Sequence, residues 1–80
     1  MRVTVRLSGS LAQRIGPRRV LELDEPVTVG DVLAALARDA SLGIDSTRSL
    51  AAVAGGAVVS SEHELSDGDE LDVLVPVAGG

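Results

Sequence analysis

The feature that most constrains the fold of this 80-residue chain is the apolar stripe of one amphipathic helix that begins near Thr28. The segment Thr28-Val29-Gly30-Asp31 has the spacing of a helix capping box, with Asp in place of the usual Glu or Gln. Leu42-Gly43 is expected to end the helix. Because a single apolar stripe needs a second apolar surface, we expect a sheet beneath it. The stripe consists of Val29, Val32, Leu33, Leu36 and Ala40.

Strand patterns before this helix supply part of the sheet. Residues 2–7 alternate polar and apolar side chains, with Val3, Val5 and Leu7 toward the core, and residues 18–23 resume the alternation. The short separation between the two segments predicts an antiparallel pair. Between them, residues 11–15 predict one short helical turn that Gly16-Pro17 ends.

Further strand patterns follow the helix. Residues 50–54 and 57–59 predict two short strands about a Gly55-Gly56 turn. Residues 60–66 are polar apart from Leu65, which predicts a loop anchored to the core by that side chain. A turn at residues 67–69 leads into the last predicted strand, residues 70–75. Its inner face carries Leu71, Val73 and Val75, and its outer face carries Asp72 and Leu74.

The order strand, strand, helix and then two or three further strands is that of the β-grasp, or ubiquitin-like, fold. We therefore predict the α+β class, with a mixed sheet of four to five strands and one main helix packed across it. Residues 1–75 are assigned to this single domain, and residues 76–80 to a flexible C-terminal Gly-Gly tail.

The composition disfavours several classes of function. The chain has no Phe, Tyr or Trp on which bases could stack, and its net charge of −5 favours a basic partner surface over nucleic acid or anionic membrane. Without cysteine it has no thiolate nucleophile. No apolar run approaches the roughly 18 residues of a membrane span, and the alternating, charged residues 1–6 are unlike a signal peptide. We expect no nucleic-acid or membrane partner, and a cytoplasmic location.

Three features that resemble catalytic or metal sites have plainer interpretations. Gly55-Gly56 suggests a phosphate loop, but the chain has no lysine to serve one, so we predict a hairpin turn. The acidic residues within 67–72 lack the ligand series of a calcium loop and fit turn chemistry. His63 lies in a polar stretch with no nucleophile motif, which favours a solvated surface residue over a catalytic base. We predict no bound metal and no catalysis by this chain alone.

The last five residues, Pro76-Val77-Ala78-Gly79-Gly80, are the candidate site. Pro76 has no amide hydrogen for a strand ladder, so regular pairing is expected to stop there. Gly79 and Gly80 lack a Cβ, and they make a thin thread that could present a terminal carboxylate inside a narrow channel. A frayed terminus without function is the alternative.

Leu74 lies on the outer strand face, two residues before Pro76. Either it is one of the single exposed leucines that are normal on protein surfaces, or it joins Val77 in an apolar contact that docks a partner. The sequence leaves both interpretations open. The other outward side chains, Arg2, Thr4 and Arg6, predict a solvated sheet face.

The segment from Leu65 to the C-terminus resembles the ubiquitin-like sulfur carriers. Asp67-Gly68-Asp69-Glu70, a short apolar strand, Pro76-Val77 and the terminal Gly-Gly recur in this order in that family. The chain most resembles the small subunit of molybdopterin synthase, the MoaD type of the MoaD/ThiS family, and its length and element order agree throughout. It departs from the pattern at Ser8, where members often carry Phe or Tyr, and at Ala54-Gly55-Gly56, where they often carry an Asn-Gly turn.

The resemblance implies a chemistry at Gly80. A partner adenylating enzyme, similar to ubiquitin-activating enzymes, would use ATP to form an acyl-adenylate there. Sulfur from a persulfide donor would then displace AMP and leave a thiocarboxylate, while the chain itself binds no cofactor. In the molybdopterin case the tail enters a large subunit, and the sulfur passes to a pterin precursor during molybdenum cofactor biosynthesis.

Other functions remain open for a chain with this resemblance. Carriers that serve thiamine, cysteine or natural-product thiolation also end in Gly-Gly. A ubiquitin-like modifier joined through Gly80 to lysines of other proteins is a function of a different class.

Overall fold

The computed structural model describes residues 1–41 and 50–75, and it confirms the predicted helix. α2 (Val29–Asp39) begins with the predicted capping box. The Asp31 amide donates to Thr28 Oγ1 at 3.3 Å, and the Thr28 amide donates to Asp31 Oδ2 at 2.9 Å. The predicted stripe faces the core: its members Val29, Val32, Leu33, Leu36 and Ala40 are all buried, together with Ala37.

α2 ends earlier than the sequence predicts. Its last residue is Asp39, which is followed by Ala40 as the C-cap and by Ser41 with a φ of 57°. Ser41 thus adopts the left-handed conformation that commonly terminates helices and that glycine usually supplies. The predicted stop at Leu42-Gly43 was wrong by a few residues, and it lies outside the described residues.

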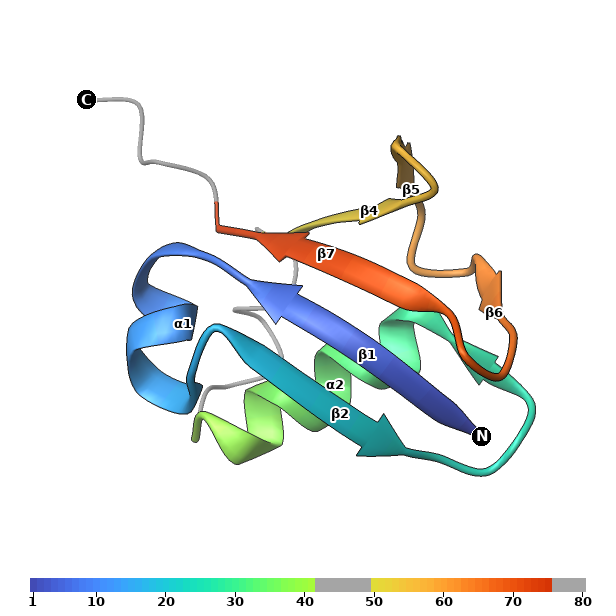
Figure 1. The fold of residues 1–80 in the computed structure, drawn as a ribbon, viewed down its shortest axis with the longest axis horizontal. Helices are drawn as coiled ribbons and strands as arrows, with labels where there is room; N and C mark the ends of the chain where they lie inside the picture. Colours follow the sequence, from blue (N-terminus) through green and yellow to red (C-terminus); the bar gives the residue numbers. More distant parts are fainter. Residues whose placement is uncertain (42–49, 76–80) are drawn as a thin grey trace.

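The sheet beneath α2 has five strands in the order β2-β1-β7-β4-β5 (Figure 1). β1 and β2 pair antiparallel, as predicted, whereas β1 and β7 pair in parallel at the centre. The mixed five-stranded sheet with a main helix across it confirms the predicted α+β, β-grasp arrangement. The strands are β1 (Arg2–Leu7), β2 (Arg18–Glu22), β4 (Ala51–Ala54), β5 (Ala57–Val59) and β7 (Glu70–Leu74).

Three elements go beyond the prediction. α1 (Gly9–Ile15) is a short helix where a single turn over residues 11–15 was predicted. β3 (Val27–Thr28) and β6 (Glu64–Leu65) form a separate two-stranded sheet. β6 lies in the segment predicted as a loop, and β3 lies directly before α2, where no strand was predicted. Strands of two residues are too short to show a period of two in the sequence. Leu65 is buried, which confirms its predicted role as an anchor.

Three strands are one residue shorter than predicted. β2 ends at Glu22, β4 begins at Ala51 and β7 ends at Leu74. The inward and outward pattern of β7 is nevertheless as predicted: Leu71 and Val73 are fully buried, and Val75 packs against the core just beyond the strand end.

The core is aliphatic and lies between α2 and one face of the five-stranded sheet. Val3, Val5, Leu71 and Val73 of the two central strands join the α2 stripe in one cluster. Among the described residues no polar side chain is buried, so the core carries no desolvation penalty of that kind. In Figure 1 α2 lies behind the sheet, and no described element covers the face toward the viewer. We call this the open face.

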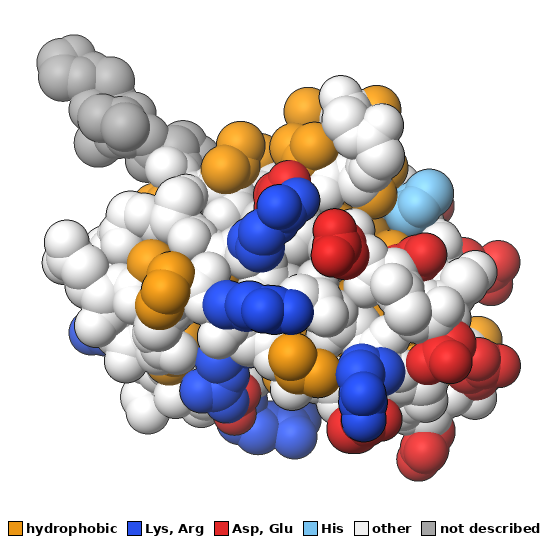
Figure 2. Space-filling view, in the orientation of Figure 1, with side chains coloured by type: hydrophobic (Ala, Val, Ile, Leu, Met, Phe, Trp, Pro, Cys, Tyr) orange, Lys and Arg blue, Asp and Glu red, His pale blue; other side chains and the backbone are white. Residues whose placement is uncertain are grey.

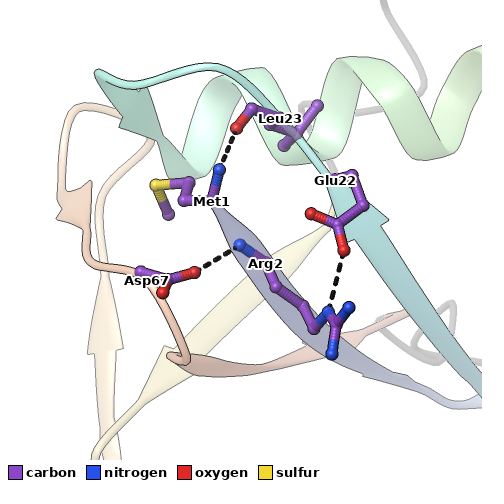
Figure 3. A network of polar contacts seen from close by, with 5 residues as sticks. All are labelled: Met1, Arg2, Glu22, Leu23 and Asp67. Atoms are coloured by element: carbon purple, nitrogen blue, oxygen red, sulfur yellow. Dashed lines mark hydrogen bonds and ion pairs between the residues drawn. The ribbon is translucent and has the colours of Figure 1, made fainter.

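The start of β1 is fastened by three contacts (Figure 3). The Met1 amino group donates to the Leu23 carbonyl, the Arg2 amide donates to Asp67 Oδ1 at 2.7 Å, and Arg2 Nε donates to Glu22 Oε1 at 2.8 Å. The hydrogen bond to Glu22, and then the charge of Glu22, raise the pKa of Arg2 above its ordinary value. Since arginine is already charged at neutral pH, this shift leaves its charge state unchanged.

Within residues 1–41 and 50–75, neither helix has the length and apolar character needed to cross a membrane.

Candidate functional site at the root of the C-terminal tail

β7 carries the chain out of the middle of the sheet, between its neighbours β1 and β4. Leu74 pairs with Ala51 at the start of β4, and Val73 pairs with Leu7 at the end of β1. The structure therefore defines the positions of Leu74 and Val75, the last two described residues. We call these two residues the root of the tail. The predicted tail residues Pro76, Val77, Ala78, Gly79 and Gly80 lie outside the described residues.

α1 supports the root on its inner side. Val75 is half-buried, and a Cβ on Gly9, the first residue of α1, would lie 3.5 Å from the Val75 Cβ. α1 is in turn held by the buried Leu11 and by Arg14, whose guanidinium donates to the Ala40 carbonyl at 2.8 Å. The position at which the chain leaves β7 is thus tied to α1 and, through Arg14, to the end of α2.

Exposed apolar side chains lie on the open face beside the root (Figure 2). Leu74 is 44% exposed and Val58 is 76% exposed. In the sheet register Ala51 stands opposite Leu74, and Val53 stands opposite Val58. We call these four residues the apolar patch. The half-buried Ala51 and Val53 lie between the two exposed side chains, so Leu74 has apolar neighbours on this face. Exposed apolar patches often mark interaction sites.

Sequence reasoning found Leu74 and missed Val53 and Val58. The signal lay in the two-residue Gly55-Gly56 turn, whose φ values of 60° and 82° fit a type I′ hairpin and confirm the predicted turn. A two-residue turn fixes the register of its strands, so residues two positions to either side of it face each other across the hairpin. Val53 and Val58 occupy these positions.

A hollow of about 300 Å³ lies next to the apolar patch. Arg6 and Asp72 pair across β1 and β7 at one side of it, with Arg6 Nε donating to Asp72 Oδ1 at 2.6 Å and Arg6 Nη2 donating to Asp72 Oδ2 at 3.3 Å. Arg6 is exposed, in agreement with the predicted solvated face. The hollow is lined by Leu7, Ser8, Val53, Val73 and Leu74 together with this ion pair.

The other candidate residues lie away from the root. His63 is exposed, as predicted, and its carbonyl accepts the Val29 amide at 2.9 Å. Asp69 Oδ2 accepts the Ser66 amide at 2.7 Å, which confirms turn chemistry for part of the acidic segment. In Figure 2 acidic side chains gather over the end of the molecule that carries β3 and β6. Among the described residues, the candidate binding surface is the apolar patch with its hollow at the root of the tail.

Solved structures resemble the chain over its whole length. SAMP1 from Haloferax volcanii has 23% identity and a TM-score of 0.80, with 100% of both chains covered. The putative molybdopterin converting factor subunit 1 from Pyrococcus furiosus has 24% identity and a TM-score of 0.79, covering 96% of this chain and 99% of that one. A complex of subunits 1 and 2 of the molybdopterin-converting factor from Helicobacter pylori matches with 22% identity, a TM-score of 0.68 and complete coverage of both chains.

At these identities the likenesses define the fold alone, that of a ubiquitin-like β-grasp protein. The sequence comparison is more specific. Residues 5–80 match the ThiS family, and the chain belongs to this family. A search of curated proteins finds no match.

Proposed function

We propose that this chain is a sulfur-carrier protein whose reactive group is the terminal carboxylate of Gly80. Membership of the ThiS family supports this class of function. The observation that carries the proposal is the position of the root beside the apolar patch, because a partner that covers the patch is also positioned to receive the tail. In the proposal Pro76, Val77, Ala78 and Gly79 form the thread that reaches the partner's active site, and Leu74 is part of the docking surface.

In the proposed reaction, the Gly80 carboxylate attacks the α-phosphorus of ATP on a partner adenylating enzyme, and pyrophosphate leaves. The resulting acyl-adenylate is an electrophile, which the carboxylate is not. A persulfide on the sulfur donor attacks the Gly80 carbonyl carbon, and AMP leaves. This leaves an acyl disulfide between Gly80 and the donor's cysteine. A second thiol then attacks the cysteine sulfur and forms a disulfide with it, the S–S bond to the acyl sulfur breaks, and a thiocarboxylate is released at Gly80. ATP is bound by the partner, and this chain binds no cofactor.

We further propose that the chain is the small subunit of a molybdopterin synthase, with a pterin precursor as the sulfur acceptor. The support is the fold likeness to a putative subunit 1 and to a complex of subunits 1 and 2 of molybdopterin-converting factors. The corresponding partner of this chain would be a large subunit. Since the reaction needs ATP and reduced thiols, the proposed location is the cytoplasm.

A ubiquitin-like modifier conjugated through Gly80 is the second candidate. The likeness to SAMP1, which is described as a small archaeal modifier protein, favours it. Both candidates begin with activation of Gly80, so they differ in what attacks the activated carbonyl: a persulfide in the carrier, and a lysine amine of another protein in the modifier.

The test uses the full chain with the purified adenylating enzyme of the same genome, ATP and a persulfide donor. The intact mass should rise by the difference between sulfur and oxygen, and removal of Gly80 should abolish the change without altering thermal unfolding. If the shortened protein still delivers sulfur to an acceptor, the carrier proposal is lost. Thiocarboxylate formation without transfer to a pterin precursor would favour thiamine, cysteine or a natural product as the destination. Adducts on lysines that survive reducing denaturation would favour the modifier.

A further inference from the structure

A small side chain, that of Ser8, lies at the end of β1 and lines the hollow beside the root. Ser8 follows Leu7 with an extended backbone, φ −135° and ψ 168°, so its side chain lies on the same side of the sheet as that of Arg6. It is half-buried and makes no capping hydrogen bond to α1. The serine side chain is too short to fill the space between the end of β1 and Leu74.

The walls of the hollow suit one apolar group. Leu74 and Val53 contribute apolar side chains, and the floor is the β1–β7 pair at Leu7 and Val73, whose own side chains are buried in the core. The volume of about 300 Å³ is at the lower limit of ligand pockets, which span about 300–1,000 Å³. This is room for one large side chain.

We propose that the hollow receives one large apolar side chain, such as Phe or Leu, from the protein that accepts the tail. The inference rests on the proposed function, because that function requires a partner at the root. The hollow shares Leu74 and Val53 with the apolar patch, so a protein surface that covers the patch also lies over the hollow. A buried apolar side chain in a central pocket, surrounded by weaker contacts, is the usual anatomy of a binding hot spot.

The ion pair at the side of the hollow adds a condition on the partner. Arg6 and Asp72 are held together by two hydrogen bonds and keep much of their surface in water, with side-chain exposures of 60% and 36%. A purely apolar surface would strip water from both groups without replacing its hydrogen bonds, which is unfavourable. Arg6 Nη2 also lies 4.0 Å from Glu70 Oε2. The inserted side chain is therefore flanked by polar groups that bind the remaining N–H groups of Arg6 and the carboxylate of Asp72.

The test fills the hollow from this chain's own side with Ser8→Phe. Because Ser8 has no capping hydrogen bond to lose, the variant should fold, and thermal unfolding checks this. Val20→Phe is the matched control, since Val20 is 50% exposed on the open face at the opposite edge of the sheet, paired with Thr4. Affinity is measured by calorimetry for the full chain against the purified large subunit and the purified adenylating enzyme of the same genome, together with thiocarboxylate formation.

The expected result is that Ser8→Phe weakens binding to at least one of these two proteins by about tenfold or more, equivalent to about 1.4 kcal/mol. Val20→Phe should bind as the wild type does. If folded Ser8→Phe binds both proteins with wild-type affinity, the inference is overturned while the proposed function stands. If the wild type binds neither protein and forms no thiocarboxylate, the proposed function fails and the inference fails with it.

Two other occupants would also overturn the inference. Concentration-dependent dimerisation of the wild type that Ser8→Phe abolishes would identify a second copy of the chain as the occupant. Changes in the amide resonances of Ser8 and Val53 when residues 76–80 are removed would identify the chain's own tail. Neither effect is expected.

Discussion

Gly9 lies directly against Val75: a Cβ on Gly9 would be 3.5 Å from the Val75 Cβ. Gly9 also has a φ of +62°, a conformation that costs a residue with a side chain about 1–2 kcal/mol. The first residue of α1 therefore combines a backbone requirement with a contact at the root of the tail. A substitution there acts both on α1 and on the direction in which the chain leaves β7.

We expect Gly9→Ala to lower the free energy of unfolding by about 1–2 kcal/mol, because the left-handed conformation is unfavourable for alanine. Urea denaturation followed by circular dichroism measures the change. Ser10→Ala is the matched control: Ser10 is the next residue of α1 and is exposed, so its substitution should alter stability by less than about 0.5 kcal/mol. An unchanged midpoint for Gly9→Ala would mean that Gly9 does not hold a positive φ in solution.

The capping box of α2 provides a second prediction. Thr28→Ala removes the hydroxyl that accepts the Asp31 amide, and such losses cost about 1 kcal/mol. For a domain of this size, that corresponds to a fall in Tm of about 4–8 °C. Thr28→Ser keeps the acceptor and should recover most of the loss. Equal losses in both variants would assign the effect to packing of the threonine methyl group.

The parts of the fold that could be predicted are those in which one face of an element is buried over several residues. A pattern of apolar residues on one side predicts burial of that side. Such patterns occur in residues 2–7, in residues 70–75 and in the stripe that begins at Val29, and the structure buries those sides. The capping box was predictable for a related reason. It consists of two reciprocal hydrogen bonds between Thr28 and Asp31, which need no other part of the chain.

The parts that could not be predicted depend on contacts between distant segments. No local pattern shows that β7 pairs in parallel with β1, or that Val27 pairs with Leu65 in a strand of two residues. Ser41 adopts a positive φ that its residue type does not favour. The hollow is lined by Ser8 at the end of β1 together with Leu74 and Val53 from two other strands. Its position becomes clear only once the sheet order is known.

The Arg6–Asp72 pair should contribute little to stability, since both side chains are partly in water. A double-mutant cycle with Arg6→Gln and Asp72→Asn should give a coupling energy of about 0.2–1 kcal/mol. The coupling should shrink in about 1 M salt, where the screening length falls to about 3 Å. The same cycle on Arg6 and Glu22, which make no ion pair with each other, should be additive. A coupling above about 2 kcal/mol would show that the pair is more shielded from water than its exposed fractions indicate.

Substitution of Leu74 tests the docking role of the apolar patch separately from its contribution to folding. Because the side chain is 44% exposed, Leu74→Ala should cost no more than about 1 kcal/mol of stability, less than the 1.5–3 kcal/mol of a fully buried leucine. If Leu74 docks the partner before any chemistry, the substitution removes binding energy shared by the ground state and the transition state. The KM of this chain as substrate of the adenylating enzyme should then rise by about tenfold with kcat unchanged.

The control for this prediction is Val20→Ala, which shortens an aliphatic side chain of similar exposure on the same face at the β2 edge. It should leave both KM and kcat at wild-type values, because β2 lies on the far side of β1 from the root. A fall in kcat for Leu74→Ala with KM unchanged would instead mean that Leu74 guides the tail during the reaction. If neither constant changes, Leu74 lies outside the surface that the adenylating enzyme binds, and the exposure of the patch has to be explained by another partner.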